Sequence, residues 1–220
     1  NWGRAGSAWS GGKYWAEPEI VEKIRQWVND GGGFIGVEDP TAYEHQGRFF
    51  QLADILGVDK EVGNRLSWSK NIRPEINRDH FILEDEIDLG VPRSTVYLDS
   101  KTAELLAGGS DSVQLAVNTF GKGRAVYFAD YVHCPQNMRL LYRAILWASR
   151  QEGQLRKWFS TNINTDCAYY PEVEEFVVMN NCEEPVETTV YNASGNSTKL
   201  SLEPLEMKWF TLNEINRICK

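Results

Sequence analysis

The sequence has little of what several classes of protein require. Its four cysteines form no CxxC pair, and His80 and His133 have no carboxylate and histidine pattern at metal spacing, so we expect no metal site. No apolar run approaches the roughly 20 residues of a transmembrane helix. Acidic residues outnumber basic residues by 31 to 23, and the net charge of −8 comes with no basic stripe. This balance argues against a nucleic-acid or membrane partner.

The cysteines and the start of the chain also lack secretory features. Cys134, Cys167, Cys182 and Cys219 are spread over a chain rich in core residues, which favours free thiols. A disulfide between Cys167 and Cys182 across a hairpin is the alternative. The chain begins without Met and without a basic or apolar leader pattern, in what reads as the middle of a loop. We therefore expect a piece of a longer polypeptide.

What is present suits one large or two small domains, since 42% of the 220 residues are hydrophobic and 12% are aromatic. Residues 1–150 alternate between helical and strand patterns, which predicts an α/β domain. Residues 151–220 contain short alternating segments separated by turn residues, which predicts a small antiparallel β-sandwich. At about seventy residues, the second domain buries little surface by itself, so we expect it to be stabilised by contacts with a neighbouring domain.

Residues 29–42, NDGGGFIGVEDPTA, raise the question of whether three glycines hold a phosphate. Residues 18–30 before them predict a helix, and residues 34–37 after them predict a buried strand. Phosphate loops have the opposite order, because the phosphate sits at the N-terminus of the following helix. The glycines therefore predict a helix-to-strand turn. The apolar face of that helix is predicted to hold Ile20, Val21, Ile24, Trp27 and Val28.

Further elements follow from periodicity. We predict a short helix from Phe49 to Leu56 ended by Gly57, strands in 102–109, 112–120 and 125–128, and a helix over 136–151. The last helix is amphipathic, with Met138, Leu141, Ile145 and Trp147 at apolar positions. Residues 62–98 give no clear pattern.

Two stretches hold candidate ligand-binding residues. Glu38 and Asp39 follow a buried strand, where open α/β sheets bind ligands, and could act as acid and base or bind a sugar hydroxyl. Alternatively, Asp39 begins a turn and Glu38 caps a following helix. His45 either donates a hydrogen bond in the same crevice or lies on a solvated loop.

The second stretch, RAGSAWSGGKYW, starts at Arg4. Its flexible N–H groups, hydroxyl and ammonium suit an oxyanion or phosphate, and its aromatic rings suit sugar stacking. The alternative is a loop whose aromatic side chains pack against the core. The candidate substrate and phosphate contacts of the whole chain are Arg4, Trp9, Ser10, Gly11, Gly12, Lys13, Glu38, Asp39 and His45.

The order of helix, glycines, strand and polar turn resembles the class I glutamine amidotransferase-like fold, a flavodoxin-like three-layer α/β domain. That fold places a catalytic cysteine on the turn where this chain has Glu38 and Asp39. His133 and Cys134 follow a later strand, but neighbours on an extended chain point in opposite directions. We therefore expect no catalytic residue in this chain, with a hydrolase using Cys134 as the rival hypothesis.

Two blocks carry a closer resemblance. WSGGKYWAEPEIVEKIRQWVNDGGGFIGVEDPTA, with FGKGRAVYFADYV and RAILWA, resembles the central domain of 1,3-β-galactosyl-N-acetylhexosamine phosphorylases, also called lacto-N-biose phosphorylases. The segment from CAYYPEVEEFVVMNN to LEPLEMKWFTL resembles their small C-terminal β domain. The resemblance implies an N-terminal (β/α)8 barrel upstream, which holds the catalytic acid and is absent here.

The resemblance also implies a function. Inorganic phosphate, as co-substrate and without any cofactor, cleaves a β-1,3-galactoside to α-galactose 1-phosphate and N-acetylhexosamine. This chain would then be a non-catalytic part that caps the active site, in a cytoplasmic bacterial enzyme. Similarity to trimeric β-galactosidases implies a homo-oligomer. The alternatives are a galactosyl-β-1,4-rhamnose phosphorylase relative and a free-standing sugar-binding or oligomerisation module.

Overall fold

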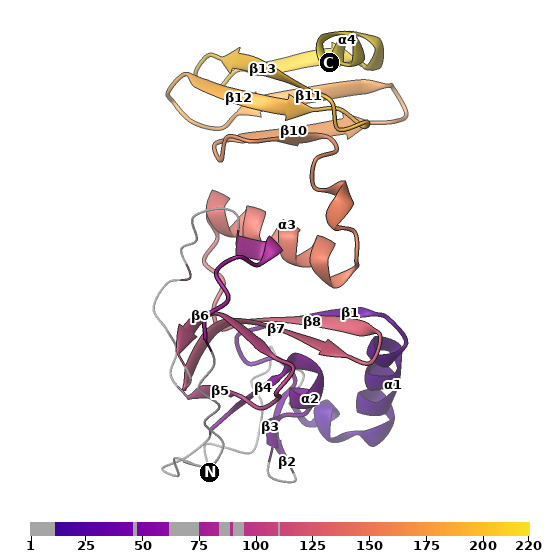
Figure 1. Ribbon diagram of the computed structural model, residues 1–220, viewed down its shortest axis with the longest axis vertical. Coiled ribbons are helices and arrows are strands. Elements are labelled where there is room, and N and C mark those ends of the chain that lie inside the picture. Colours follow the sequence, from indigo (N-terminus) through magenta and orange to yellow (C-terminus); the bar gives the residue numbers. More distant parts are fainter. Residues whose placement is uncertain (1–11, 46–47, 62–74, 84–88, 90–94, 110) are drawn as a thin grey trace. The chain divides into compact units, whose positions relative to one another are not determined.

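The computed structural model describes residues 12–45, 48–61, 75–83, 89, 95–109 and 111–220 (Figure 1). The chain divides into two compact units. Unit 1 comprises Asn1–Arg150, and unit 2 comprises Gln151–Lys220.

A four-stranded mixed sheet forms the centre of unit 1. One outer strand runs parallel to its neighbour, and the remaining pairs are antiparallel. Buried apolar residues dominate the two middle strands, as expected for strands covered on both faces. In spatial order the strands are β1 (Gly33–Val37), β8 (Gly123–Phe128), β7 (Ser112–Phe120) and β6 (Glu104–Gly109).

Helices cover both faces of this sheet. On one face, Val21 and Val28 of α1 (Pro18–Asn29) pack with the N-cap and with Ile55 of α2 (Ala53–Leu56), and with Ala125 of β8. On the other face, α3 (Pro135–Ala148) packs against the sheet, as Figure 1 shows. The contacts there join Leu140, Ala144 and Trp147 to Val126 and Phe128. Unit 1 therefore has three layers, with the sheet in the middle.

The triple glycine is a helix-to-strand turn, as predicted. Helix α1 ends at Asn29 and strand β1 starts at Gly33. Gly31 has φ of 125°, a backbone conformation that side chains disfavour. A Cβ on Gly33 would lie 2.6 Å from the carbonyl oxygen of Ala148 in α3. The glycines thus allow a tight turn and a close approach between layers.

The predicted helix from Phe49 to Leu56 is wrong in its first half. Phe49 and Phe50 belong to β3 (Arg48–Phe50), which pairs with β2 (Ala42–His45). The cause is tertiary, because the carboxylate of Asp59 accepts hydrogen bonds from both phenylalanine N–H groups at 3.2 and 2.8 Å. Only α2 remains helical before Gly57, which ends it with φ of 74°. Asp59 itself lies in β4 (Val58–Lys60), which pairs with β5 (Val96–Leu98).

The apolar faces of two helices are partly shifted from their predicted positions. On α1, Trp27 is 55% exposed although Val21 and Val28 are buried. On α3, Met138 and Ile145 are about half exposed, at 49% and 48%. The buried side of α3 follows Leu140 and Ala144 instead, because that side faces the sheet. Short 3₁₀ helices, η1 (Gly12–Ala16) and η2 (Phe81–Leu83), complete the described part of unit 1.

Unit 2 consists of two three-stranded antiparallel sheets and a terminal helix. The sheets enclose one core, in which Phe176 and Val178 meet Val190 and Leu202, and Ile215 of the terminal helix closes it. One sheet contains β10 (Thr165–Tyr170), β11 (Glu175–Asn180) and β14 (Met207–Thr211). The other contains β13 (Ser197–Leu202), β12 (Val186–Tyr191) and β9 (Phe159–Ser160). The short η3 (Glu152–Gln154) precedes them, and α4 (Leu212–Ile218) follows with a Thr211–Glu214 capping box.

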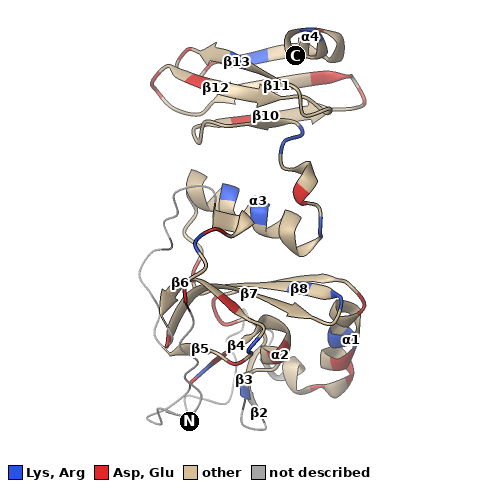
Figure 2. Cartoon of the chain, in the orientation of Figure 1, with Lys and Arg blue, Asp and Glu red and all other residues tan. Residues whose placement is uncertain are grey.

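The four cysteines are free thiols. Cys167 donates to the carbonyl oxygen of Trp158 and Cys182 to the side chain of Asn180, so the alternative Cys167–Cys182 disulfide is not formed. Figure 2 shows acidic and basic residues interspersed over both units. Within the described ranges, no helix is long and apolar enough to cross a membrane, and no group of three His, Cys, Asp or Glu side chains is placed to hold a metal ion.

Candidate functional site

The carboxyl ends of β1 and β8 meet at one edge of the sheet because the two strands are parallel. Glu38 comes directly after β1 and has φ of 60°, which is unusual for a residue with a side chain. Its N–H donates to the carbonyl oxygen of Phe128 at 2.8 Å, and the Tyr127 hydroxyl donates to its carbonyl oxygen at 3.1 Å. Strand β8 therefore holds the Glu38 backbone in this conformation, with the side chain exposed. Strained residues of this kind often occur at functional sites.

Asp39 forms an ion pair next to Glu38. Its Oδ1 lies 2.7 Å from the Nζ of Lys60 in β4, and both side chains are partly exposed. The same Lys60 ammonium lies 5.6 Å from the ring centre of Phe49. The turn continues through buried Thr41, whose hydroxyl accepts from the N–H of Leu52. The chain then enters β2, so the alternative in which Glu38 caps a following helix is wrong.

The structure brings two of the predicted segments together. The 3₁₀ helix η1, which contains Gly12 and Lys13, packs against β2, which contains His45. His45 pairs with Arg48 across the β2–β3 hairpin, so it lies on a strand and not on a solvated loop. The side chains of Lys13 and His45 lie outside the described part of the structure. So do the candidate contacts Arg4, Trp9, Ser10 and Gly11.

The His133–Cys134 pair is not arranged as a dyad. Both residues precede α3, and Cys134 is the residue at its N-cap. His133 is exposed and Cys134 is half-buried, and neither side chain hydrogen-bonds to another described residue. Burial, and secondarily the nearby Cys134, raises the pKa of Tyr131, whose hydroxyl donates to the Sδ of Met138 at 3.3 Å. This edge therefore offers phenol and carboxylate groups, and His133 and Cys134 do not form a hydrogen-bonded pair there.

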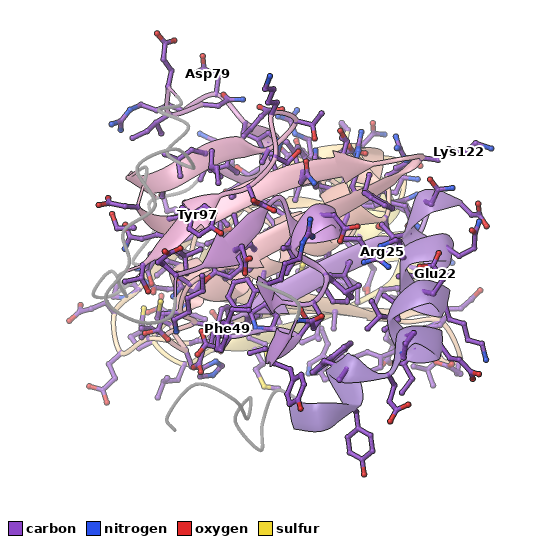
Figure 3. The ribbon with its side chains drawn as sticks, turned by 90° about the horizontal axis from the view of Figure 1, so that it is seen from below. Glu22, Arg25, Phe49, Asp79, Tyr97 and Lys122 are labelled. Carbon is purple, nitrogen blue, oxygen red and sulfur yellow. The ribbon has the colours of Figure 1, made fainter. Side chains whose placement is uncertain are left out.

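A cleft of about 480 Å³, which no sequence pattern predicted, is surrounded by η1, the start of α1, β3 and α2. Its side chains include Trp15, Glu22, Arg25, Arg48 and Asp54. Figure 3 shows Glu22 and Arg25 on α1. The Arg25 Nε donates to Asp54 at 2.7 Å and Nη1 donates to Glu22 at 2.9 Å. The hydrogen bond that Arg25 donates to Asp54 raises the pKa of Arg25, with a smaller contribution from Glu22.

The helical pattern of α1 placed Arg25 on its solvated face, and nothing in the local sequence links it to Asp54. Their separation of 29 positions is closed only when α2 packs beside α1. A polar residue with a distant partner gives no periodic signal. The cleft could therefore be found only from the folded chain.

Comparison with known proteins identifies the family. A family model described as the lacto-N-biose phosphorylase central domain matches residues 1–153, and one described as the lacto-N-biose phosphorylase C-terminal domain matches residues 158–210. The chain belongs to the lacto-N-biose phosphorylase family. The two matched regions follow the division into unit 1 and unit 2 closely.

Curated relatives within the lacto-N-biose phosphorylase family are much longer than this chain. A 1,3-beta-galactosyl-N-acetylhexosamine phosphorylase of Lachnoclostridium phytofermentans is 41% identical over 218 residues, which cover 97% of this chain and 30% of the relative. The enzyme of the same description from Bifidobacterium longum is 34% identical over 244 residues, covering 95% of this chain and 32% of the relative. A D-galactosyl-beta-1->4-L-rhamnose phosphorylase of L. phytofermentans is 33% identical, covering 90% and 27%. The chain thus spans less than a third of the length of these relatives.

A solved structure supports the fold of this family member. The cold-adapted β-galactosidase of Rahnella sp. R3 matches 86% of this chain with a TM-score of 0.52 and 15% sequence identity. The match covers 30% of that enzyme. At this identity the likeness concerns the fold alone.

Proposed function

We propose that this chain is the non-catalytic portion of a galactoside phosphorylase, and that it serves in assembly and in capping the active site. The supporting observation is how much of each chain the matches to relatives cover. Two 1,3-beta-galactosyl-N-acetylhexosamine phosphorylases match over 97% and 95% of this chain, yet the matches fill only 30% and 32% of their lengths. The remainder of such a protein is long enough for a (β/α)8 barrel, which typically takes about 250 residues. We place the catalytic acid in that upstream barrel.

The proposed reaction is an inverting phosphorolysis. An oxygen of inorganic phosphate attacks the anomeric carbon of the β-1,3-linked galactose while the glycosidic C–O bond breaks. A carboxylic acid of the barrel gives its proton to the leaving oxygen, which releases N-acetylhexosamine and forms α-D-galactose 1-phosphate. An inverting hydrolase needs a second carboxylate to activate water, but phosphate is already anionic. The site instead needs donors that hold the phosphate, and it needs no further cofactor.

We propose that the segment ending in η1 supplies part of the phosphate and sugar contacts. Ser10, Gly11, Gly12 and Lys13 combine a hydroxyl, backbone N–H groups and an ammonium, and Arg4 and Trp9 belong to the same segment. The packing of η1 on β2 supports a common site with His45, and the carboxyl edge of β1 adds Glu38 and Asp39.

The contribution of this segment can be tested in the complete enzyme. Replacing Lys13 and Ser10 with Ala should raise the KM for phosphate while leaving the KM for the disaccharide nearly unchanged. Lys23→Ala, on the exposed side of α1, is the matched control. A phosphate KM equal to that of the unmodified enzyme would exclude both residues.

A second substrate has specific support. The D-galactosyl-beta-1->4-L-rhamnose phosphorylase is 33% identical over 205 residues, only slightly less than the B. longum enzyme. We propose that acceptor choice is set mainly in the barrel, so that this portion serves enzymes of either specificity. A free-standing sugar-binding or oligomerisation module is the remaining candidate.

The decisive experiment compares this chain with the same chain joined to its native upstream sequence. Release of galactose 1-phosphate from galactosyl-β-1,3-N-acetylglucosamine and phosphate is measured for both, and galactosyl-β-1,4-rhamnose is tested in parallel. Activity in the joined form alone would support the proposal. Activity of the 220-residue chain by itself, or of neither form on either substrate, would refute it.

We also propose that unit 1 is an amidotransferase-like domain of the flavodoxin-like type and that the whole protein is a cytoplasmic homo-oligomer. Helices on both faces of a sheet with a parallel pair, and positive φ at Glu38 directly after β1, support the first part. Four free thiols support a reducing compartment. Sedimentation of the joined protein tests the oligomer, and a monomer at working concentration would exclude an assembly role.

A further inference from the structure

The cleft beside α1 has the composition of a binding site for a small polar molecule. Its volume of about 480 Å³ falls within the range of ligand pockets. Aromatic, apolar and polar groups line it together, among them Trp15, Val21 and four charged side chains. Val21 is buried and Trp15 packs partly against the neighbouring core, so the apolar part rests on rigid elements.

The charges in the cleft balance. Arg25 and Arg48 contribute two positive charges, and Glu22 and Asp54 contribute two negative charges. Arg25 is held by Asp54 at 2.7 Å and by Glu22 at 2.9 Å, so its charge is already compensated. A site for phosphate or a carboxylate would need an excess of positive charge. The balance favours a neutral ligand.

Arg48 differs from Arg25 in how firmly it is held. Its guanidinium lies 3.8 Å from Asp54 and 4.0 Å from Asp99, and 45% of the side chain is exposed. These distances exceed those of a hydrogen bond. Arg48 can therefore turn its N–H groups to a ligand without breaking a short bond, while Asp54 remains fixed by Arg25.

We propose that this cleft binds a neutral pyranose sugar, with Trp15 as its aromatic wall and Arg48 and Asp54 as partners of the hydroxyl groups. A sugar ring presents apolar C–H groups that pack on an aromatic surface, and its hydroxyls both donate and accept hydrogen bonds. Guanidinium donors beside a fixed carboxylate acceptor match that combination.

Saturation-transfer NMR on the 220-residue chain tests the proposal with galactose, methyl β-galactoside and N-acetylglucosamine. We expect transfer to at least one pyranose, with a Kd of about 1 to 10 mM for such a small ligand. Inorganic phosphate is the anionic comparison and myo-inositol is the comparison for a polyol without a pyranose ring. The result is independent of any phosphorolysis assay, because no catalysis is measured.

Variants locate the binding. Arg48→Met should weaken sugar binding about tenfold or more, whereas Arg156→Met, at an exposed arginine of unit 2, should leave it unchanged. Trp15→Phe should keep binding and Trp15→Leu should lose it. Trp27→Leu, at the exposed tryptophan of α1, is the control for the two Trp15 variants. A two-dimensional amide spectrum of each variant confirms that it is folded.

Several outcomes would overturn the proposal. They are the absence of transfer to any pyranose, equal transfer to myo-inositol, competition by phosphate, and binding that persists in folded Arg48→Met and Trp15→Leu. Loss of binding in those two variants, with the Arg156 and Trp27 controls unchanged, would establish the site.

Discussion

Replacing Asp59 with alanine should destabilise unit 1 by about 2 to 4 kcal/mol. Asp59 is only 2% exposed, and its Oδ1 accepts three backbone hydrogen bonds. Two of them come from β3, from the fully buried Phe50 at 2.8 Å and the partly buried Phe49 at 3.2 Å. Each buried N–H that loses its acceptor costs about 1 to 3 kcal/mol, and the partly buried one costs less. The sum gives the expected range.

Asp59→Asn separates the hydrogen bonds from the charge. The amide keeps an oxygen acceptor for the N–H groups, so the loss should be about 1 kcal/mol or less near neutral pH. Burial raises the pKa of Asp59 above its ordinary value of 3.8, although the N–H groups of β3 and Lys60 oppose the shift. The folded state therefore binds the proton more tightly than the unfolded state. Stability of the unmodified protein must then fall as pH rises from the ordinary pKa through the raised one.

Asparagine does not titrate. The free energy of unfolding of the Asp59→Asn variant should therefore increase relative to that of the unmodified protein as pH rises through that window. Urea titration with pulsed hydrogen exchange, read by mass spectrometry on peptides of unit 1, gives the free energy of unfolding for that unit alone. Asp79→Ala is the control, since Figure 3 shows Asp79 at the periphery and its side chain is exposed. Equal losses in Asp59→Ala and Asp59→Asn, or a relative stability of the asparagine variant that worsens with pH, would refute the reasoning.

Three further substitutions test other parts of unit 1 with the same measurement. Gly57→Ala should cost unit 1 about 2 kcal/mol or more, because φ is 74° and the new Cβ would lie 2.6 Å from that of Ala103. Gly153→Ala, with open space around it, should leave the stability of unit 2 nearly unchanged when peptides of that unit are read instead; equal effects on the two units would contradict this. Asn118→Leu should cost about 2 to 4 kcal/mol, since the buried Asn118 amide donates to two carbonyl groups of α2 at 3.0 and 2.9 Å. A loss below about 1 kcal/mol would show that water replaces the amide as the donor. Glu38→Gly should stabilise by about 0.5 to 1 kcal/mol, because relief of the strain at positive φ, about 1 to 2 kcal/mol, exceeds the entropy cost of a glycine. Destabilisation would mean that the side chain contributes more than the strain.

The sequence pattern predicted those elements that are determined by residues within the element itself. Helix α1, the glycine turn, β1 and the β7–β8 hairpin match the predictions because each carries its own periodicity and turn residues. The β2–β3 hairpin was missed because Phe49 and Phe50 read as helix, and only the distant Asp59 carboxylate fixes them as a strand. The shifted apolar face of α3 has a similar cause, since the sheet decides which side of the helix is buried.

Candidate site residues could be predicted only where they directly follow a predicted strand in the sequence. Glu38 and Asp39 were predicted at the sheet edge because polar residues follow a buried strand there, and the structure places them directly after β1, while their role in binding stays a prediction. The partner Lys60 and the cleft residues Arg25, Arg48 and Asp54 were not found, since their contacts join separate elements. Sequence pattern contains no information on which charged residue meets which across such distances.

The parallel pairing of β1 with β8 affects the order in which the protein folds during synthesis. Residues matched in register, such as Gly33 and Arg124, lie about 90 positions apart, so closing this contact carries a large loop entropy. Strand β1 leaves the ribosome long before β8 has been synthesised, so β1 remains unpaired with β8 during that time. The hairpins of unit 2 join near neighbours in sequence, so that unit can form its sheets quickly once translated. We expect nascent chains that stop before residue 123 to be the stage most open to chaperones and proteases.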